Sequence, residues 1–169
     1  MTLTAPTGTT QTMGAALLAL GMAVTVGTAL GFQHIGGYIP CKLCLEQRLP
    51  YYIGVPVATL ALAAAAFRLP PLLVRGLLLA VALLMMWSIF LGAFHSGVEW
   101  GFWPGPADCG AVALPPSGSG SLLDQLDAVI PPSCDQAAGR FLGLSFAGWN
   151  VVASLGLSAI AWAAALRKA

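Results

Sequence analysis

Residues 76–94 read GLLLAVALLMMWSIFLGAF, an apolar run without a single charged side chain. At about 1.5 Å of rise per residue, a helix of this length crosses most of the roughly 30 Å hydrocarbon core of a bilayer. A helix in a soluble domain usually keeps a polar face toward water, and this run has none. The run therefore predicts a membrane-spanning helix.

Three further stretches of the chain have the same character. They are residues 13–32, 49–67 and 141–166, and none of them contains Asp, Glu, Lys or Arg. The chain has 58% hydrophobic and 8% charged residues and a mean hydropathy of +0.85, whereas about a quarter of the residues of a soluble domain are charged. We therefore expect an all-α four-helix membrane bundle, with residues 1–169 forming a single domain. The net charge of +1 argues against a nucleic-acid partner.

Charged residues are unevenly divided between the two sides of this bundle. The link 68–75 and the tail 167–169 hold four of the seven basic residues and no acidic residue, so both should be cytoplasmic. Residues 1–12 carry no Lys or Arg, so we expect the first apolar stretch to be a retained helix rather than a cleaved signal peptide. The loops 33–48 and 95–140 then face outward, and they contain all six acidic residues and all four cysteines. In a bacterial inner membrane, this side is the oxidising periplasm.

The second outer loop contains a short helical pattern. Residues 114–120 are rich in Pro, Gly and Ser and predict a flexible loop. Apolar residues then recur at helical spacing through residues 121–130, before Pro131 and Pro132. The pattern predicts an interfacial helix lying on the membrane surface, although packing of a loop helix against the bundle would explain it equally well.

A pair of cysteines stands directly before the second span, where residues 40–44 read PCKLC. Cys41 and Cys44 can close a small disulfide ring, and pairs at this spacing often contain one thiol of lowered pKa. The cations Lys42 and Arg48 and the start of the following helix would favour a thiolate. A thiolate is the form that attacks a disulfide or an electrophilic quinone ring.

The second pair of cysteines, Cys109 and Cys134, brackets the flexible part of the second outer loop. A disulfide between them would close a long loop, and its freedom suits exchange with an external thiol and with the first pair. Four cysteines permit three complete pairings, and the sequence leaves all three open. Two purely structural disulfides would use the same residues. We expect no metal, because a zinc site needs two close ligand pairs and these two cysteines are 25 positions apart.

Two polar residues at the outer ends of the spans are candidate quinone ligands. Arg48 follows Cys44 by four positions, which places both on one helical face if the helix has already begun. Its guanidinium could hydrogen-bond a quinone carbonyl or stabilise a thiolate. His95 ends the third span and could pass a proton to the quinone. Interfacial arginine and histidine side chains are the alternatives, and Glu46 and Glu99 are assigned no catalytic role.

Together these residues resemble the DsbB family, the disulfide bond formation proteins of bacterial inner membranes. The resemblance covers nearly the whole chain and rests on Phe32-Gln33-His34, Pro40 to Cys44, Gln47-Arg48, His95, Cys109, Cys134 and Phe141 to Leu144. It implies an oxidoreductase that reoxidises a periplasmic thioredoxin-fold protein of the DsbA type and passes the electrons to ubiquinone or menaquinone. By motif position, Cys109 would form the mixed disulfide with this partner, and Cys134 would exchange with Cys41.

The resemblance also implies the quinone site. Cys44 would face the quinone, with Arg48 beside it and His95 nearby. The acidic residue between the second cysteine and the arginine is Glu46 here, and its position varies in the family. A quinone reductase of the vitamin K epoxide reductase type is a rival, disfavoured because its loop cysteines precede the CxxC motif. A non-catalytic membrane scaffold with structural disulfides is the other alternative.

Overall fold

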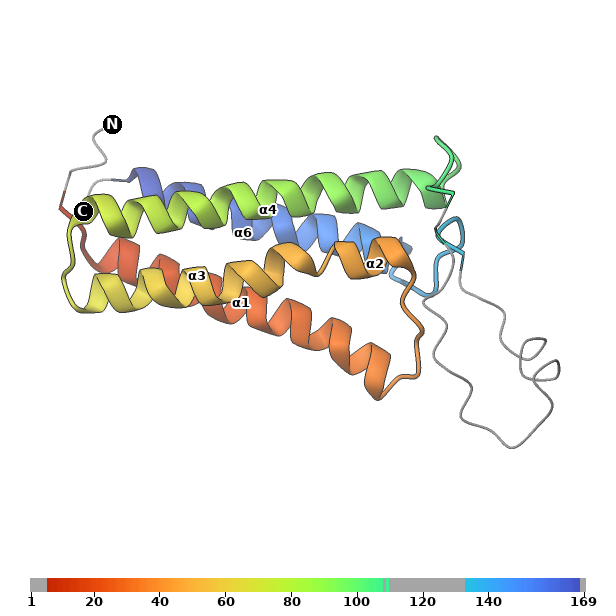
Figure 1. The fold of residues 1–169 in the computed structure, drawn as a ribbon, viewed down its shortest axis with the longest axis horizontal. Coiled ribbons are helices and arrows are strands. Elements are labelled where there is room, and N and C mark those ends of the chain that lie inside the picture. Colours follow the sequence, from red (N-terminus) through yellow and green to blue (C-terminus); the bar gives the residue numbers. More distant parts are fainter. Residues whose placement is uncertain (1–5, 108, 110–132, 168–169) are drawn as a thin grey trace.

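The computed structural model describes residues 6–107, 109 and 133–167, and the predicted helix at 121–130 lies outside them. Figure 1 shows long helices running side by side, with the start of α1 and the end of α6 at one end of the bundle. The helices are α1 (Thr9–His34), α2 (Lys42–Glu46), α3 (Leu49–Ala66), α4 (Pro71–Glu99) and α6 (Phe146–Leu166). The strands are β1 (Arg140–Phe141) and β2 (Leu144–Ser145).

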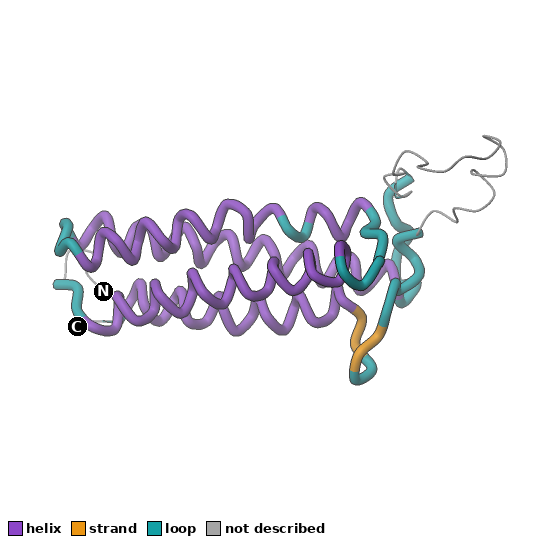
Figure 2. The backbone as a smooth tube through the Cα atoms, turned by 90° about the horizontal axis from the view of Figure 1, so that it is seen from below, coloured by secondary structure: helices purple, strands orange, loops and turns teal. Residues whose placement is uncertain are grey.

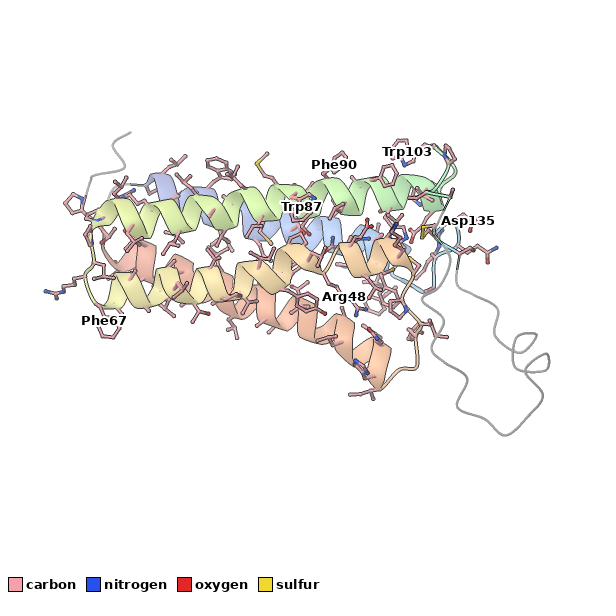
Figure 3. All side chains as sticks on the ribbon, viewed as in Figure 1. Arg48, Phe67, Trp87, Phe90, Trp103 and Asp135 are labelled. Carbon is pink, nitrogen blue, oxygen red and sulfur yellow. A yellow bond between two sulfur atoms is a disulfide. The ribbon has the colours of Figure 1, made fainter. Side chains whose placement is uncertain are left out.

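Four helical segments are long and apolar enough to cross a membrane: α1, the segment Lys42–Ala66 that contains α2 and α3, α4, and α6. Helix α4 packs against α3 and α6, and α1 packs against the same two helices, which closes the bundle. Large apolar side chains point away from it, among them Phe67 and Phe90 (Figure 3), which are 79% and 65% exposed. Such a surface suits contact with lipid. The structure thus confirms the predicted all-α four-helix membrane bundle.

The interior of the bundle is built from small and aliphatic side chains. A methyl group added at Gly14 of α1 would lie 2.5 Å from the Cβ atom of Ala164 on α6, so these helices approach closely only because glycine is present. Fully buried residues along the core are Leu18, Met22, Ala58, Leu78, Val81, Met85 and Ala161. Close packing of this kind stabilises helix pairs in lipid, where no hydrophobic effect drives them together.

A polar cluster lies within this apolar core. The hydroxyl of Tyr51 donates to Oδ1 of Asn150 at 2.7 Å and lies 2.7 Å from the hydroxyl of Ser154. Ser154 donates in turn to the hydroxyl of Ser88 at 2.8 Å. These bonds link α3, α4 and α6, and they satisfy polar groups that would otherwise be costly in a membrane.

The third span is longer than residues 76–94, and its first turns correct the prediction that Arg75 lies in a connecting link. Pro71 occupies the first turn of α4, where its missing N–H costs nothing. Arg75 is only 1% exposed and donates to the carbonyl oxygens of Ala165 at 2.6 Å, Arg167 at 2.9 Å and Pro6 at 3.1 Å. A cation is favourable there because the last carbonyl groups of α6 lack partners within that helix.

The fourth span begins at Phe146 rather than Phe141. Residues 140–145 instead form a hairpin in which Arg140 pairs with Ser145 and Phe141 with Leu144. The two turn residues, Leu142 and Gly143, both have positive φ angles, 50° and 84°, as a tight hairpin of this kind requires. Figure 2 shows this hairpin at the opposite end of the bundle from the chain termini. We call this opposite end the cysteine end, because Cys41, Cys44, Cys109 and Cys134 all lie there.

Candidate redox site

The CxxC pair sits at the start of α2. Cys41 is the N-cap residue, with extended backbone, and its sulfur accepts a hydrogen bond from the backbone N–H of Cys44 at 3.4 Å. Both thiols are free, and their sulfur atoms lie 3.2 Å apart. This separation is short enough for a disulfide to form with a small movement. The pair can therefore cycle between dithiol and disulfide in place.

The second pair is a disulfide, Cys109–Cys134, with its Cα atoms 5.7 Å apart. This bond selects one of the pairings that the sequence left open. The two cysteines differ in exposure, because Cys134 is 2% exposed whereas Cys109 is only partly buried. The sulfur atoms of Cys41 and Cys134 and a ring nitrogen of His95 all lie within 4.8 Å of one another. The bundle thus brings together two cysteines that are 93 positions apart in the chain.

His95 lies against the CxxC pair. It is 2% exposed, and its Nε2 lies 3.7 Å from the sulfur of Cys41. On the other side of the ring, Nδ1 is 2.6 Å from the amide nitrogen of Gln47. Glu99, one helical turn further along α4, has Oε1 3.8 Å from Nε2 of His95. His95 therefore faces Cys41 and Glu99.

The pKa of the Cys41 thiol is lowered. The main cause is the hydrogen bond from the Cys44 thiol, and the neighbouring His95 ring and the backbone N–H of Cys44 act in the same direction. Burial opposes these effects, because it disfavours the charged form. The balance favours a thiolate at Cys41, the form that takes part in thiol–disulfide exchange.

A cavity of about 430 Å³ opens on the other side of Cys44. Arg48, in the turn between α2 and α3, lines it and donates to Oε1 of Gln33 on α1. Figure 3 shows Arg48 in the space between α3 and α1. Most of the wall is apolar or aromatic, and it includes Val24, Ala29, Phe32, Tyr38, Phe141, Phe146 and Trp149. The cavity also contains the side chains of Tyr51 and Asn150 from the buried polar cluster.

Three aromatic rings form one wall of this cavity. The ring of Phe146 lies 5.0 Å from that of Phe32 and 5.5 Å from that of Tyr38, and the last two are 5.9 Å apart. They come from α1, the following loop and α6, so the cavity exists only once these elements have packed. An apolar cavity of this size with a few polar groups is typical of a small-molecule site.

The predicted site residues fall into two groups. Cys44 and Arg48 line the large cavity, whereas His95 does not. His95 instead lines a small pocket that also contains Cys41, Cys44 and Glu99. Cys44 is the predicted site residue that borders both spaces, so it connects the thiol pair with the large cavity.

Four residues that were not among the predicted site residues lie at the site. Gln47 contacts His95, Glu99 lies in the same small pocket, Gln33 bonds Arg48, and Phe146 lines both spaces. Gln33 could have been noticed as an amide at the end of an apolar span, and Glu99 as an acid at the end of another. The contacts of Gln47 and Phe146 depend on helix packing, which the local sequence does not reveal.

Comparison with known proteins identifies the relatives of this chain. The family model for disulfide bond formation protein DsbB matches residues 11–164. A disulfide bond formation protein B of Saccharophagus degradans is 33% identical over 161 residues, which cover 92% of this chain and 93% of that protein. A disulfide bond formation protein B of Polaromonas sp. is 29% identical over 147 residues, which cover 86% of this chain and 84% of that protein.

An uncharacterized protein of Rickettsia prowazekii, RP370, is 27% identical over 134 residues, which cover 78% of this chain and 74% of that protein. No solved structure matches this chain. The match to the family model covers most of the chain, and four helices able to span a membrane accompany it. The chain is therefore a multi-pass membrane protein that belongs to the DsbB family of disulfide bond formation proteins.

Proposed function

We propose that this protein oxidises a periplasmic thioredoxin-fold protein of the DsbA type and transfers the electrons to a membrane quinone, ubiquinone or menaquinone. The family supports disulfide formation as its activity. The proposal adds the partner, the acceptor and the order Cys109–Cys134 before Cys41–Cys44. It also places the protein in the bacterial inner membrane as a single domain, with the cysteine end in the periplasm.

One observation carries this proposal: Cys44 borders the 430 Å³ cavity, while its partner Cys41 faces Cys134 on the other side. Electrons arriving at Cys134 can thus pass to Cys41 and leave from Cys44. Each transfer joins groups that are already neighbours. No large movement of the bundle is needed for these two transfers.

The residues around the cavity fit a quinone. A quinone has an apolar ring and tail and two carbonyl oxygens, so it needs an apolar wall and a small number of donors. The aromatic wall supplies the first, and the guanidinium of Arg48 supplies donors beside Cys44. When bound there, a quinone would accept two electrons and two protons.

The chain's own residues supply the other parts of the mechanism. Cys109 is the more exposed member of its disulfide, so an external thiolate would attack its sulfur and release Cys134. Cys134 then attacks Cys41 in the oxidised CxxC pair, which leaves a thiolate on Cys44. Arg48 stabilises that negative charge and holds Cys44 and the acceptor in one cavity.

The orientation of the chain rests on its charges. Arg68 follows α3 and Arg167 follows α6, at the ends of these helices opposite to the cysteine end. Positively charged segments remain in the cytoplasm. The buried Arg75 satisfies helix carbonyl groups and so carries less weight in this argument than the sequence suggested. A reporter active only in the cytoplasm should work when fused to the C-terminus.

The direct test uses the purified full-length protein in lipid nanodiscs with a reduced DsbA-type protein. We expect catalytic oxidation of that protein when ubiquinone or menaquinone is supplied, and loss of turnover when any one of the four cysteines is replaced by alanine. Arg140→Met serves as a matched control, because Arg140 is exposed on β1 outside the cavity lining. A wild-type protein that turns over with neither quinone would contradict the proposal.

A further inference from the structure

His95 lies in the small pocket between the two cysteine pairs and has little access to water. It is 2% exposed, and together with Cys41 and Glu99 it lines a space of about 10 Å³. A cavity needs roughly 10–15 Å³ to hold one water molecule, so bulk water does not fill this space. Buried polar groups in folded proteins are almost always hydrogen-bonded, so each ring nitrogen of His95 needs a partner from the protein.

Gln47 decides which nitrogen of this ring carries the proton. Its amide nitrogen donates to the carbonyl oxygen of Leu43 at 3.3 Å, and an amide oxygen in the same place would face another acceptor. The amide is therefore oriented with its nitrogen toward His95, where it lies 2.6 Å from Nδ1. Nδ1 accepts this hydrogen bond, so the proton of the neutral ring is on Nε2.

The Nε2–H group of His95 has the sulfur of Cys41 as its nearest acceptor. The sulfur is 3.7 Å from Nε2, whereas Oε1 of Glu99 is 3.8 Å away, which is too far for an N–H···O hydrogen bond. Cys41 also faces Cys44 on α2 and Cys134 in the second outer loop. The described residues that line the pocket include no Lys or Arg, so hydrogen bonds must stabilise a negative charge on Cys41. The Cys44 thiol is the main cause of the lowered pKa of Cys41, and His95 adds to it.

We infer that Gln47 is a positioning residue, which holds neutral His95 in the tautomer that donates a hydrogen bond to the Cys41 thiolate of the reduced CxxC pair. His95 transfers no proton in this role. Two electrons from a thiol reductant and one proton convert the Cys41–Cys44 disulfide into the Cys41 thiolate and the Cys44 thiol. The Nε2–H group stabilises this product more than the disulfide, whose sulfur atoms carry no charge. A stabilised reduced form makes the pair a stronger oxidant. The inference goes beyond the proposed function, because it needs neither a quinone nor a partner protein.

The tautomer can be read directly from the ring nitrogens. The full-length protein, with the CxxC pair reduced, is placed in nanodiscs with isotope-labelled histidine, and magnetic resonance distinguishes protonated from unprotonated ring nitrogens. The chain has two histidines, so a His34→Asn variant assigns the signals of His95. We expect Nε2 to be protonated and Nδ1 to be unprotonated in the wild type. In Gln47→Glu a carboxylate faces Nδ1, so Nδ1 should become protonated.

The ionisation of Cys41 tests the effect of this arrangement. Variants are made in a protein that keeps only the CxxC pair (Cys109→Ala with Cys134→Ala), and the ultraviolet absorbance of the thiolate is followed against pH, with the oxidised protein as the blank. His95→Phe should lower the ionisation constant of Cys41 about tenfold, as expected for the loss of one hydrogen bond to a charged group. In glutathione buffers the reduction potential of the pair should fall by about 30 mV, which is the same tenfold change. Gln47→Met should have a smaller effect of the same sign, and no further effect when His95→Phe is already present.

Gln11→Met is the matched control. Gln11 is another buried glutamine, and it lies at the opposite end of the bundle, where it donates to the carbonyl oxygens of Ala164 and Arg167. Its loss should lower the stability of the bundle without changing the tautomer of His95 or the ionisation of Cys41. A general loosening of the bundle is thereby separated from an effect on the ring.

Three results would overturn the inference. A wild-type ring with a proton on Nδ1 would do so without any variant, so the test does not depend on how well the variants fold. An unchanged ionisation of Cys41 in His95→Phe would show that the ring does not stabilise the thiolate. Effects of Gln47→Met and His95→Phe that simply add would indicate a structural role for Gln47. Absence of quinone turnover in a protein that meets all these expectations would contradict the proposed function alone.

Discussion

Replacement of Arg48 by methionine tests the assignment of the large cavity as the quinone site. Methionine keeps an unbranched apolar side chain of similar length, so the wall of the cavity changes little in shape. What disappears is the positive charge beside Cys44 and the hydrogen-bond donors, one of which holds Gln33. The change therefore isolates the electrostatic contribution of this residue.

The expected loss follows from that geometry. A hydrogen bond that involves a charged group contributes about 1.5–3 kcal/mol. Since about 1.4 kcal/mol corresponds to a factor of ten, kcat/KM for quinone should fall roughly 10- to 150-fold in Arg48→Met. The KM for the protein partner should not change, because the partner is expected to react at Cys109.

The assay measures steady-state oxidation of the reduced partner while the quinone concentration is varied, and then with quinone in excess while the partner is varied. Gln33→Leu separates two roles of Arg48, because it breaks the link to α1 and leaves the charge in place. We expect Gln33→Leu to cost less than Arg48→Met. An unchanged kcat/KM for quinone in Arg48→Met would refute the reasoning, and equal losses in both variants would show that the arginine only anchors α1.

Three other predictions follow from the same structure. Cys109→Ala should stop oxidation of the partner protein but leave the Cys41/Cys44 pair reducible by a small dithiol, and normal turnover of the protein substrate would show that the order of transfer is wrong. The lowered pKa of Cys41 stabilises the reduced Cys41/Cys44 pair. This stabilisation is fully present when the pH is above the ordinary thiol pKa, and it is lost as the pH falls through the lowered pKa of Cys41. Between these two pKa values the reduced pair binds one proton instead of two, so the reduction potential of the pair should change by about 30 rather than about 60 mV per pH unit. Equilibration in glutathione buffers measures this slope, and a slope of about 60 mV per pH unit at neutral pH would contradict the prediction. Arg75→Met should lower the free energy of unfolding by about 1–3 kcal/mol, because it leaves the buried carbonyl of Ala165 without its donor. Thermal unfolding followed by circular dichroism should show this loss, whereas the exposed Arg68→Met should unfold like wild type.

The sequence predicted the four spans because each is an apolar run, and the ends of the spans were harder to place. Arg75 and Glu99 are charged and were therefore assigned to links, yet both lie inside α4. The helical position of Arg75 is tolerated because the carbonyl groups at the end of α6 accept its hydrogen bonds, and the carboxylate of Glu99 lies beside His95 one turn earlier on α4. The hairpin at residues 140–145 was missed because Phe141 and Leu144 continue the apolar run, so its composition does not differ from that of a span.

The candidate site could be predicted in its composition but not in its arrangement. The CxxC motif and Arg48 stand close together in the sequence, so local spacing was enough to relate them. Cys134 and Cys41 belong to different loops, and their sulfur atoms lie close together only because the whole bundle packs as it does. The position of His95 beside Cys41 depends on the contact between α2 and α4, which no local pattern encodes.

The most direct test of the central claim separates the two cysteine pairs. One variant, Cys109→Ala with Cys134→Ala, keeps only the CxxC pair, and the other, Cys41→Ala with Cys44→Ala, keeps only the loop pair. Each is reduced, freed of reductant and mixed with excess quinone, and the quinol formed per chain is counted. The account predicts one quinol per chain from the CxxC pair and none from the loop pair. Equal quinol formation by both variants, or none by the variant that keeps Cys41 and Cys44, would contradict it.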